Sequence, residues 1–296
     1  MTDTPLTSST NRSAGPADAA NTGTPAAGDP INGTPSLADP DAEQERIVRF
    51  LADRVDEAGA DGLVVNMSGG LDSTVTAALA AEAVGPDRVY GLILPSNKVG
   101  EPHARDAEAL AEALGIEFDT AHLHPLVGAF DAAAPDRFSL QENPMLSGNL
   151  AARLRMSMAY LAANATNALV VGTTNRSEHL LGYVTKHGDG AADLLPIGHR
   201  YKSEVRELAD ALSVPAFVRE KPPSAGFLFG QRDADDLGAS YPIVDAVLHL
   251  AVDEALDPAT VVERTGADRE TVDRLLDRYE HGAHKRTPAP MPDAER

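Results

Sequence analysis

The chain has 296 residues and a mass of 31.1 kDa, and 43% of its residues are hydrophobic, which is enough to bury a sizeable core. Its formal net charge of −20 argues against a surface that coats nucleic acid or an anionic membrane. Cys is absent, which excludes disulfides, zinc knuckles, iron–sulfur clusters and a cysteine nucleophile.

The basic residues are divided unequally, with only five Lys among the 25 Lys and Arg. A surface rich in carboxylates and poor in Lys is typical of a protein kept soluble in concentrated salt, where charge repulsion is screened. We therefore expect a halophilic source. An ordinary acidic protein would explain the charge but not the scarcity of Lys, and the few Lys that remain should mark positions that need an ammonium group.

Residues 1–40 are rich in Pro, Gly, Ser and Thr and contain few large apolar side chains. Such a segment cannot offset its ordering entropy by burial, so we predict a disordered tail. Residues 1–30 lack the basic start and apolar stretch of a secretory signal, and the longest uncharged run, 156–175, is interrupted by polar residues. We therefore expect a cytoplasmic protein that does not enter a membrane.

From residue 41 onward, helical patterns alternate with short apolar runs. The pattern predicts strands at 63–67, 89–94, 116–123 and 168–172, and helices from 41, at 73–83, ending at 114, at 149–163, at 202–212 and throughout 241–281. Strands separated by helices form right-handed crossovers and a parallel sheet covered on both faces. We expect one α/β domain over residues 41–296, with a five-stranded, mostly parallel sheet and C-terminal helices packed on it.

The loop between the first strand and the next helix reads Ser68-Gly69-Gly70-Leu71-Asp72-Ser73. Its glycines allow backbone to approach phosphate oxygens, its hydroxyls can donate hydrogen bonds, and the helix N-terminus adds free amides. The string fits neither G-x-x-x-x-G-K-[ST] nor G-x-G-x-x-G. It resembles the pyrophosphate loop of the ATP pyrophosphatases, which cleave ATP between its α- and β-phosphates.

A second polar loop, residues 172–178, follows the fourth strand and ends in Glu178. Because both loops leave the carboxyl edge of one parallel sheet, they should face one crevice. Mg²⁺ is commonly held by one or two carboxylates together with substrate phosphates, and Asp72 with Glu178 would supply that pair.

More motifs follow in a fixed order. They are the loop 182–190, Tyr201-Lys202-Ser203, Lys221-Pro222-Pro223-Ser224-Ala225-Gly226, residues 230–233 and His284-Lys285-Arg286. In this order and combination, residues 41–288 resemble the ammonia-dependent NAD synthetases, a family of the N-type ATP pyrophosphatase superfamily with an adenine nucleotide α-hydrolase-like fold. Four of the five Lys lie inside these motifs.

The resemblance implies roles for individual residues. ATP would be bound by Asn66, Met67, Ser68, Gly69, Gly70, Leu71, Asp72, Ser73, Thr173, Lys202 and Ser224, and Mg²⁺ by Asp72 and Glu178. Deamido-NAD would be bound by Arg153, Lys186, Asp193, His284 and Lys285. The groups with a part in the chemistry would be Asp72, Glu178, Lys186 and Lys202. The family also implies a homodimer with the dinucleotide near the subunit interface.

Two positions depart from the family pattern. Asn66 stands where the family usually has Gly, and Phe227-Leu228-Phe229 stands near the usual Leu-Trp pair. Neither change removes a group that the chemistry needs.

The implied reaction begins with activation of a carboxylate, because oxide or hydroxide is too poor a leaving group for ammonia to displace. The nicotinate carboxylate of deamido-NAD would attack the α-phosphorus of ATP, and ammonia would then displace AMP from the acyl adenylate. Without Cys or the length for a glutaminase domain, the chain should use free ammonia or accept it from a separate protein. Another adenylating ATP pyrophosphatase and a non-catalytic nucleotide-binding regulator remain as alternatives.

Overall fold

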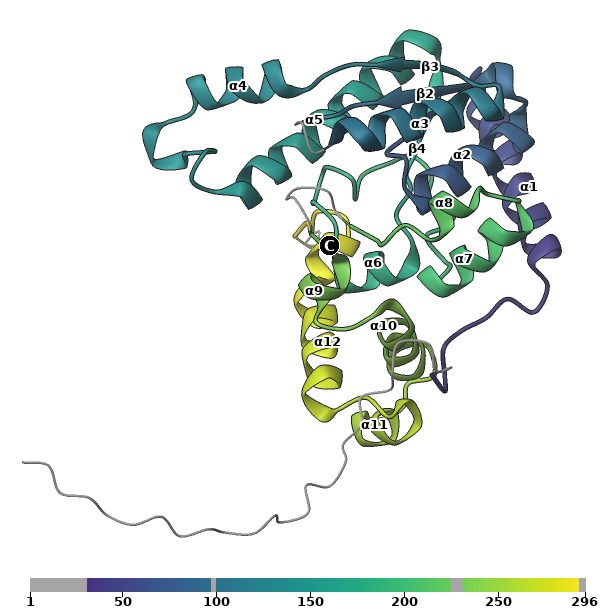
Figure 1. Ribbon diagram of the computed structural model, residues 1–296, viewed down its shortest axis with the longest axis vertical. Coiled ribbons are helices and arrows are strands. Elements are labelled where there is room, and N and C mark those ends of the chain that lie inside the picture. Colours follow the sequence, from purple (N-terminus) through teal and green to yellow (C-terminus); the bar gives the residue numbers. More distant parts are fainter. Residues whose placement is uncertain (1–30, 97–99, 225–230, 293–296) are drawn as a thin grey trace, which may run out of the picture.

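The computed structural model describes residues 31–292 except 97–99 and 225–230. Its centre is a parallel sheet of β1 (Gly62–Asn66), β2 (Val89–Ile93), β3 (Glu117–Thr120) and β4 (Ala168–Val171), in the order β3-β2-β1-β4 (Figure 1). The chain builds the sheet outward from β1 to β3 and then returns to place β4 on the other side of β1. The order in which strands are added to the sheet therefore reverses between β1 and β4, although the strands themselves are parallel.

The expectation of five strands is wrong for the described residues, which form four. At the outer edge of β4 a single parallel bridge joins Val171 to Leu194. The carboxylate of Asp193 accepts a hydrogen bond from the Val170 N–H at 2.8 Å, where a further strand would place a backbone carbonyl. Two residues beyond Leu194 the chain reaches Pro196, which has no N–H to continue a ladder.

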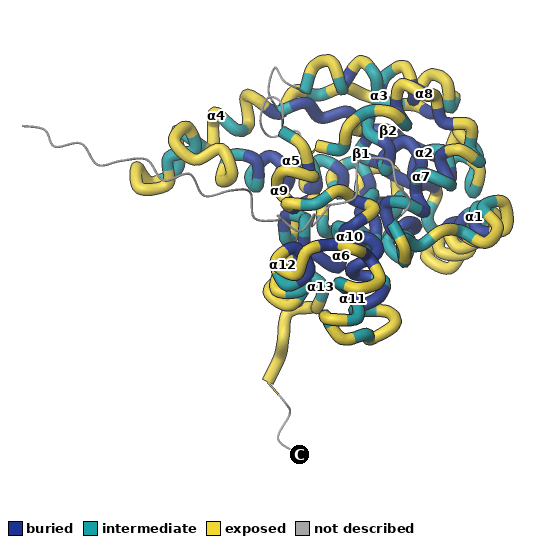
Figure 2. Tube along the Cα trace, turned by 60° about the horizontal axis from the view of Figure 1, so that its bottom comes forward, coloured by how far each residue is buried: buried dark blue, intermediate teal, exposed yellow. Residues whose placement is uncertain are grey.

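Helices cover both faces of the sheet, as the alternating pattern predicts. One face carries α1 (Pro40–Ala58), α2 (Leu71–Val84), α3 (Glu101–Leu114) and α7 (Lys202–Ala211), and the other carries α5 (Pro144–Thr166). Successive strand residues serve different cores: Leu63 and Val65 pack with α1 and α2, whereas Val64 packs with α5. Figure 2 shows the buried interior that results.

The C-terminal helices form a separate hydrophobic cluster below the carboxyl edge of the sheet (Figure 1). They are α9 (Asp233–Leu237), α10 (Tyr241–Leu248), a π-helical turn (His249–Asp253), α11 (Pro258–Thr265), α12 (Arg269–His281) and α13 (Ala283–Arg286). Leu180 and Leu181 of the short helix α6 (Arg176–Leu181) pack into this cluster. The predicted helical C-terminus is therefore confirmed, although it consists of several short helices.

Five described helices lie outside the ranges expected from the sequence: α6, α9 and α13, given above, and two others. Helix α8 (Ala216–Arg219) follows α7, and α4 (His124–Ala133) runs away from the body beside the start of α5 (Figures 1 and 2). Helix α4 has no buried residue.

Of the proposed tail, residues 1–30 lie outside the described residues. Just before α1, Ile31 and Leu37 pack against the two hydrophobic clusters, and the Leu37 N–H donates to Glu207.

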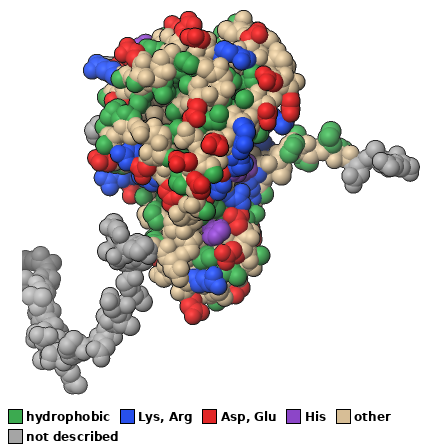
Figure 3. Space-filling view, turned by 90° about the vertical axis from the view of Figure 1, so that its right-hand side faces the viewer, with side chains coloured by type: hydrophobic (Ala, Val, Ile, Leu, Met, Phe, Trp, Pro, Cys, Tyr) green, Lys and Arg blue, Asp and Glu red, His purple; other side chains and the backbone are tan. Residues whose placement is uncertain are grey.

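Acidic side chains are spread over the face shown in Figure 3, with basic side chains among them. Within the described ranges, no helix is both long and apolar enough to cross a membrane.

Candidate active site

The site lies where the sheet reverses its strand order. β1 ends at Asn66 and α2 begins at Leu71, while β4 ends at Val171 and α6 begins at Arg176. Since β1 and β4 are neighbouring parallel strands, both connecting loops open at the same edge. Open α/β sheets bind their ligands in the crevice at such a switch point. The expectation that the two loops share one crevice is thus confirmed.

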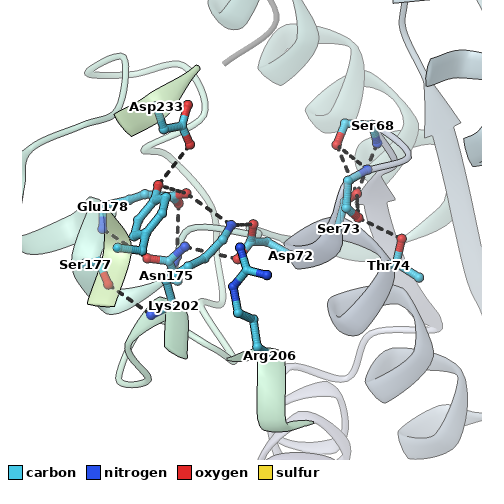
Figure 4. Close-up of polar contacts among 12 residues, drawn as sticks. Ser68, Asp72, Ser73, Thr74, Asn175, Ser177, Glu178, Lys202, Arg206 and Asp233 are labelled. Carbon is cyan, nitrogen blue, oxygen red and sulfur yellow. Dashed lines mark hydrogen bonds and ion pairs between the residues drawn. The ribbon is translucent and has the colours of Figure 1, made fainter. Parts of the chain in front are cut away.

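The glycine loop is held in shape by its own hydroxyl groups (Figure 4). Ser73 Oγ accepts from the Ser68 N–H at 3.2 Å, lies 3.0 Å from Ser68 Oγ and donates to the Gly70 carbonyl at 3.1 Å. Thr74 Oγ1 donates to the same carbonyl at 2.7 Å. Gly69 has φ +71°, in the left-handed region that favours glycine. Gly70 is the N-cap of α2 and contributes no side-chain cap, so the first amides of a fourteen-residue helix open toward the crevice.

Across the crevice, the ammonium group of Lys202 lies between two carboxylates (Figure 4). It forms an ion pair with Asp72 and lies 4.0 Å from Glu178 Oε1. The Lys202 side chain is only 4% exposed, while those of Asp72 and Glu178 are 16% and 18% exposed and line the crevice. The residues come from the first turns of three helices, α2, α6 and α7.

Asn175 connects the two loops. Its side-chain oxygen caps α6 by accepting from the Glu178 N–H, and the Glu178 carboxylate accepts from the Asn175 N–H in return. The Asn175 amide group donates to Asp72 Oδ1 at 3.0 Å. One fully buried side chain thus fixes the two carboxylates relative to each other.

Burial and neighbouring charges shift the pKa values of Glu178 and Lys202. Burial and the negative charge of Asp72 raise the pKa of Glu178 to about 8. Burial alone would lower the pKa of Lys202, but the charges of Asp72 and Glu178 raise it above its usual value. At neutral pH the Glu178 carboxyl therefore favours its protonated form, beside the charged ammonium of Lys202.

Helices α9 and α10 contribute residues that the sequence gave no reason to assign. Asp233 accepts hydrogen bonds from the hydroxyls of Tyr241 at 3.0 Å and Tyr183 at 3.2 Å, and burial raises its pKa. The Tyr241 ring lies 5.2 Å from Lys202 Nζ, a cation–π contact. Asp233 stands in a motif quoted from the sequence, but its approach to Lys202 depends on how the C-terminal helices pack.

The crevice forms a pocket of about 330 Å³. Of the residues predicted to bind ATP, those that line it are Asn66, Met67, Ser68, Gly70, Leu71, Asp72, Ser73, Thr173, Lys202 and Ser224. Gly69 is buried beneath, against the backbone of α3. Residues 227–229, the second departure from the family pattern, lie outside the described residues, and so does Lys98, which follows the second predicted strand.

Asn66, the departure from the family pattern, stands at the end of β1. Its side-chain oxygen is buried and has no hydrogen-bond partner within the described part of the chain. An unpaired buried acceptor is unfavourable by about 1–3 kcal/mol. The end of β1 therefore presents an oxygen that a donor group of a ligand would satisfy.

Three basic residues in the pocket wall were not predicted to act there. Arg155 donates to the Leu94 carbonyl and to Ser96 Oγ, and Arg206 lies beside Asp72 (Figure 4). Lys221 donates to the Gly69 carbonyl at 3.2 Å and pairs with Asp106 at 2.8 Å. With Lys202 they match in number the four carboxylates of the pocket wall, which are those of Asp72, Glu178, Asp189 and Asp233.

The residues predicted to bind the dinucleotide do not line this pocket. Exposed Arg153 donates to the Lys186 carbonyl at 3.2 Å. Lys285 donates to the carbonyls of Gly182 and Val184, beneath the loop 182–190, and His284 beside it is exposed. The Asp193 carboxylate accepts hydrogen bonds from the Tyr160 hydroxyl and from the Val170 N–H at the edge of β4. The structure brings Arg153, Lys186 and Lys285 together around one loop, and Asp193 to its far end.

The donor set fits a magnesium ion that is also bound by its substrate. No group of three or more His, Asp or Glu side chains among residues 31–96, 100–224 and 231–292 could hold a metal alone. Asp72 and Glu178 supply two carboxylates, and Mg²⁺ usually takes one or two together with phosphate oxygens and water.

Comparison with known proteins identifies the family. Residues 43–289 match the family model described as NAD synthase. The curated NH(3)-dependent NAD(+) synthetases of Methanosarcina mazei and Methanocaldococcus jannaschii are 43% and 40% identical to the chain, over 84% of the chain in each case and over 97% and 95% of the relatives.

Two solved structures share the fold over 87% of this chain and the whole of theirs. An NMN synthetase from Francisella tularensis has a TM-score of 0.77 at 34% identity, and an NH3-dependent NAD synthetase from Campylobacter jejuni has a TM-score of 0.72 at 28% identity. With its glycine loop, its paired carboxylates and these likenesses along nearly its whole described length, the chain belongs to the NAD synthase family.

Proposed function

We propose that this protein is an ammonia-dependent NAD synthetase, a ligase that amidates the nicotinate carboxylate of deamido-NAD at the expense of ATP. Its products are NAD, AMP and diphosphate. The observation that carries the proposal is the placement of Lys202 between Asp72 and Glu178, opposite the glycine loop. The names of its archaeal relatives agree with it.

The first step brings two anions together, so the protein must mainly neutralise charge and align groups. The open amides of α2 and the hydroxyls of Ser68 and Ser73 bind the β- and γ-phosphates that leave as diphosphate. The ammonium of Lys202 stabilises the charge that develops on the departing oxygens. When bound by Asp72 and Glu178, Mg²⁺ supplies further neutralisation of the phosphate oxygens.

The acidic dinucleotide needs a basic surface of its own. Arg153, Lys186, His284 and Lys285 supply it around the loop 182–190, and Asp193 anchors the far end of that loop to β4. Thr173 and Ser224 contact the nucleotide from the pocket wall. No residue of the described site has to form a covalent bond to the substrate, because ammonia itself attacks the acyl adenylate and AMP leaves.

We also infer a homodimer. Helices α4 and α5 expose six large apolar side chains on themselves and on the turn between them: Leu126, Phe130, Phe138, Met145, Leu146 and Leu161. Arg153 lies on the same α5. A second copy covering these helices would bury the apolar side chains and bring its surface close to the dinucleotide residues. Light scattering should give a dimer, and Phe130→Glu should yield more monomer.

A second candidate substrate comes from the Francisella neighbour, which is named an NMN synthetase. That name implies amidation of the mononucleotide, with the same activation chemistry and a shorter substrate. The arrangement of Lys202, Asp72 and Glu178 serves either substrate equally. The two substrates are distinguished by offering nicotinate mononucleotide and deamido-NAD separately and comparing kcat/KM.

The test is a product assay with pure protein, ATP, Mg²⁺, deamido-NAD and ammonium in concentrated KCl. NAD, AMP and diphosphate should form in equal amounts. Asp72→Ala should abolish turnover, whereas Asp87→Ala, at an exposed carboxylate away from the pocket, should leave it unchanged. ADP in place of AMP would overturn the proposal, and tight ATP binding without turnover would favour a nucleotide-binding regulator.

A further inference from the structure

A fully buried carboxylate lies behind the site and has no part in the chemistry described above. Asp245 of α10 is 0% exposed. One of its oxygens accepts from Ser177 Oγ at 2.5 Å, and the other accepts from the backbone N–H and the hydroxyl of Ser203 at 2.8 and 2.7 Å. Among the ion pairs of the described residues, none involves Asp245.

The two serines stand next to the residues that do the chemistry. Ser177 immediately precedes Glu178, and Ser203 immediately follows Lys202. Ser177 Oγ also accepts from the Lys202 backbone N–H at 3.0 Å (Figure 4). Asp245 therefore joins the first turns of α6 and α7 alongside the direct bond from Lys202 to Ser177, although residues 182–201 separate the two helices in sequence.

An ionised carboxylate without a cationic partner is expensive to bury, even with three hydrogen bonds. Burial raises the pKa of Asp245 to about 6, because the charged form of the carboxyl is unfavourable in a buried position. Its neighbours on α10 are apolar: Val244 and Val247 are fully buried in the C-terminal hydrophobic cluster. An apolar side chain at this position would leave the Ser203 N–H and the hydroxyls of Ser177 and Ser203 without their acceptor, so the carboxylate is explained by these hydrogen bonds.

We propose that Asp245 is a positioning residue for the adenylation step, holding the Glu178 carboxylate and the Lys202 ammonium at their working separation through Ser177 and Ser203. The proposal rests on the proposed function, since it assigns work to Glu178 and Lys202. Asp245 touches neither substrate nor metal. It fixes the backbone from which both side chains project, while Asn175, the N-cap of α6, fixes Glu178 relative to Asp72.

The geometry explains why one carboxylate suits this position. Its two oxygens accept three hydrogen bonds from two helices at once, which no apolar residue and no hydroxyl can do. An amide in its place keeps the shape but has only one acceptor oxygen, so one of the two serines loses the carboxylate oxygen that it donates to. The first turn of α6 or α7 would then be held less firmly, and Glu178 or Lys202 would shift with it.

The test compares Asp245→Asn with Thr265→Val, a matched change at a buried, hydrogen-bonded residue of α11 far from the pocket. Asp245→Asn should raise the Mg²⁺ concentration that gives half-maximal activity about tenfold and lower kcat about 10- to 100-fold, the scale expected for catalytic groups misplaced by up to about 1 Å. The KM for deamido-NAD should change little. Thr265→Val should lower the melting temperature and leave both kinetic values unchanged.

If Asp245→Asn lowers only the melting temperature, with wild-type kcat and Mg²⁺ requirement, Asp245 is merely structural and the proposal is wrong. If Asp245→Asn does not fold, Ser177→Ala carries the test, with the same expected rise in Mg²⁺ requirement and the same contrary result. The failures of the two proposals can be told apart. If the wild type makes no NAD, the proposed function is wrong. If calorimetric titration shows that Asp245→Asn binds ATP and Mg²⁺ as the wild type does, the positioning role is wrong.

Discussion

Gly69→Ala tests the glycine loop directly, because Gly59→Ala is a matched control in the same chain. Both glycines have left-handed backbone, with φ of +71° and +61°. Alanine in this region is unfavourable by about 1–2 kcal/mol, so both variants should lose that much stability. Their surroundings differ, because a Cβ at Gly59 meets no atom within 4 Å.

A Cβ at Gly69 would approach the backbone oxygen of His103 to less than 3.0 Å, and would lie 3.1 Å from the Ala107 nitrogen. Both neighbours are backbone atoms of α3 and cannot rotate away. The loop must therefore shift by several tenths of an ångström, which moves the amides that bind the phosphates. A shift toward 1 Å lowers the rate about 100-fold, so we expect kcat/KM for ATP to fall about 10- to 100-fold.

The assay measures kcat/KM for ATP and the free energy of unfolding for both variants. Gly59→Ala should lose stability alone, and Gly69→Ala should lose both stability and ATP turnover. If Gly69→Ala keeps kcat/KM within twofold of the wild type, the loop amides do not bind the phosphates as argued.

Three further predictions concern charge. Burial and the charge of Asp72 raise the pKa of Glu178 to about 8, so binding of ATP with Mg²⁺ at pH 7 should release close to one proton. The heat of binding measured by calorimetry should then depend on the ionisation enthalpy of the buffer. A heat of binding that is independent of the buffer would contradict this prediction. Hydrogen bonds from Arg200, Arg46 and His199 outweigh burial and hold the pKa of Glu43 well below its usual value. The stabilising contribution of the Glu43 carboxylate is thus complete above its unfolded-state pKa of about 4.5 and is lost as the pH falls toward its lowered folded-state pKa. Glu43→Gln should therefore lower the free energy of unfolding by about 3 kcal/mol at pH 7 and make that free energy less dependent on acid pH. With a net charge of −20, the protein should melt at a higher temperature in concentrated KCl than in dilute buffer, and full stability in dilute buffer would contradict the halophilic interpretation.

The parts of the fold that follow from local sequence were predictable. The apolar run, glycine loop and helix around Asp72 are set by neighbouring residues, and helix α2 begins within two residues of the expected start. The approach of Glu178 to Asp72 also followed, because parallel strands place their loops at one edge. Lys202 entered through family resemblance, since nothing in its local sequence gives its direction.

Other parts depend on contacts distant in sequence. The fifth strand failed at Asp193, where a side chain takes the place of the backbone at the edge of β4. Asp233, Tyr241 and Asp245 acquire their surroundings from the packing of the C-terminal helices against α6 and α7. The hydrophobic periodicity of a helix does not predict that packing, because the packing depends on which helices lie against each other. The double role of Asn175, as helix cap and as donor to Asp72, was likewise missed in a motif from which only Thr173 and Glu178 were assigned.

The crowding of Asp72, Glu178 and Asp233 around a single ammonium has a consequence for how the sequence can evolve. The carboxylates repel one another in a poorly solvated place, so the fold is weaker for carrying them. A library of variants screened by heating without nucleotide should therefore enrich neutral replacements at Glu178 and Asp233, and its survivors should be inactive. The same library heated with ATP and Mg²⁺ should retain the acids, because ligand binding then repays the repulsion. For this protein, the ligand present during selection should decide whether thermostability and activity rise together or apart.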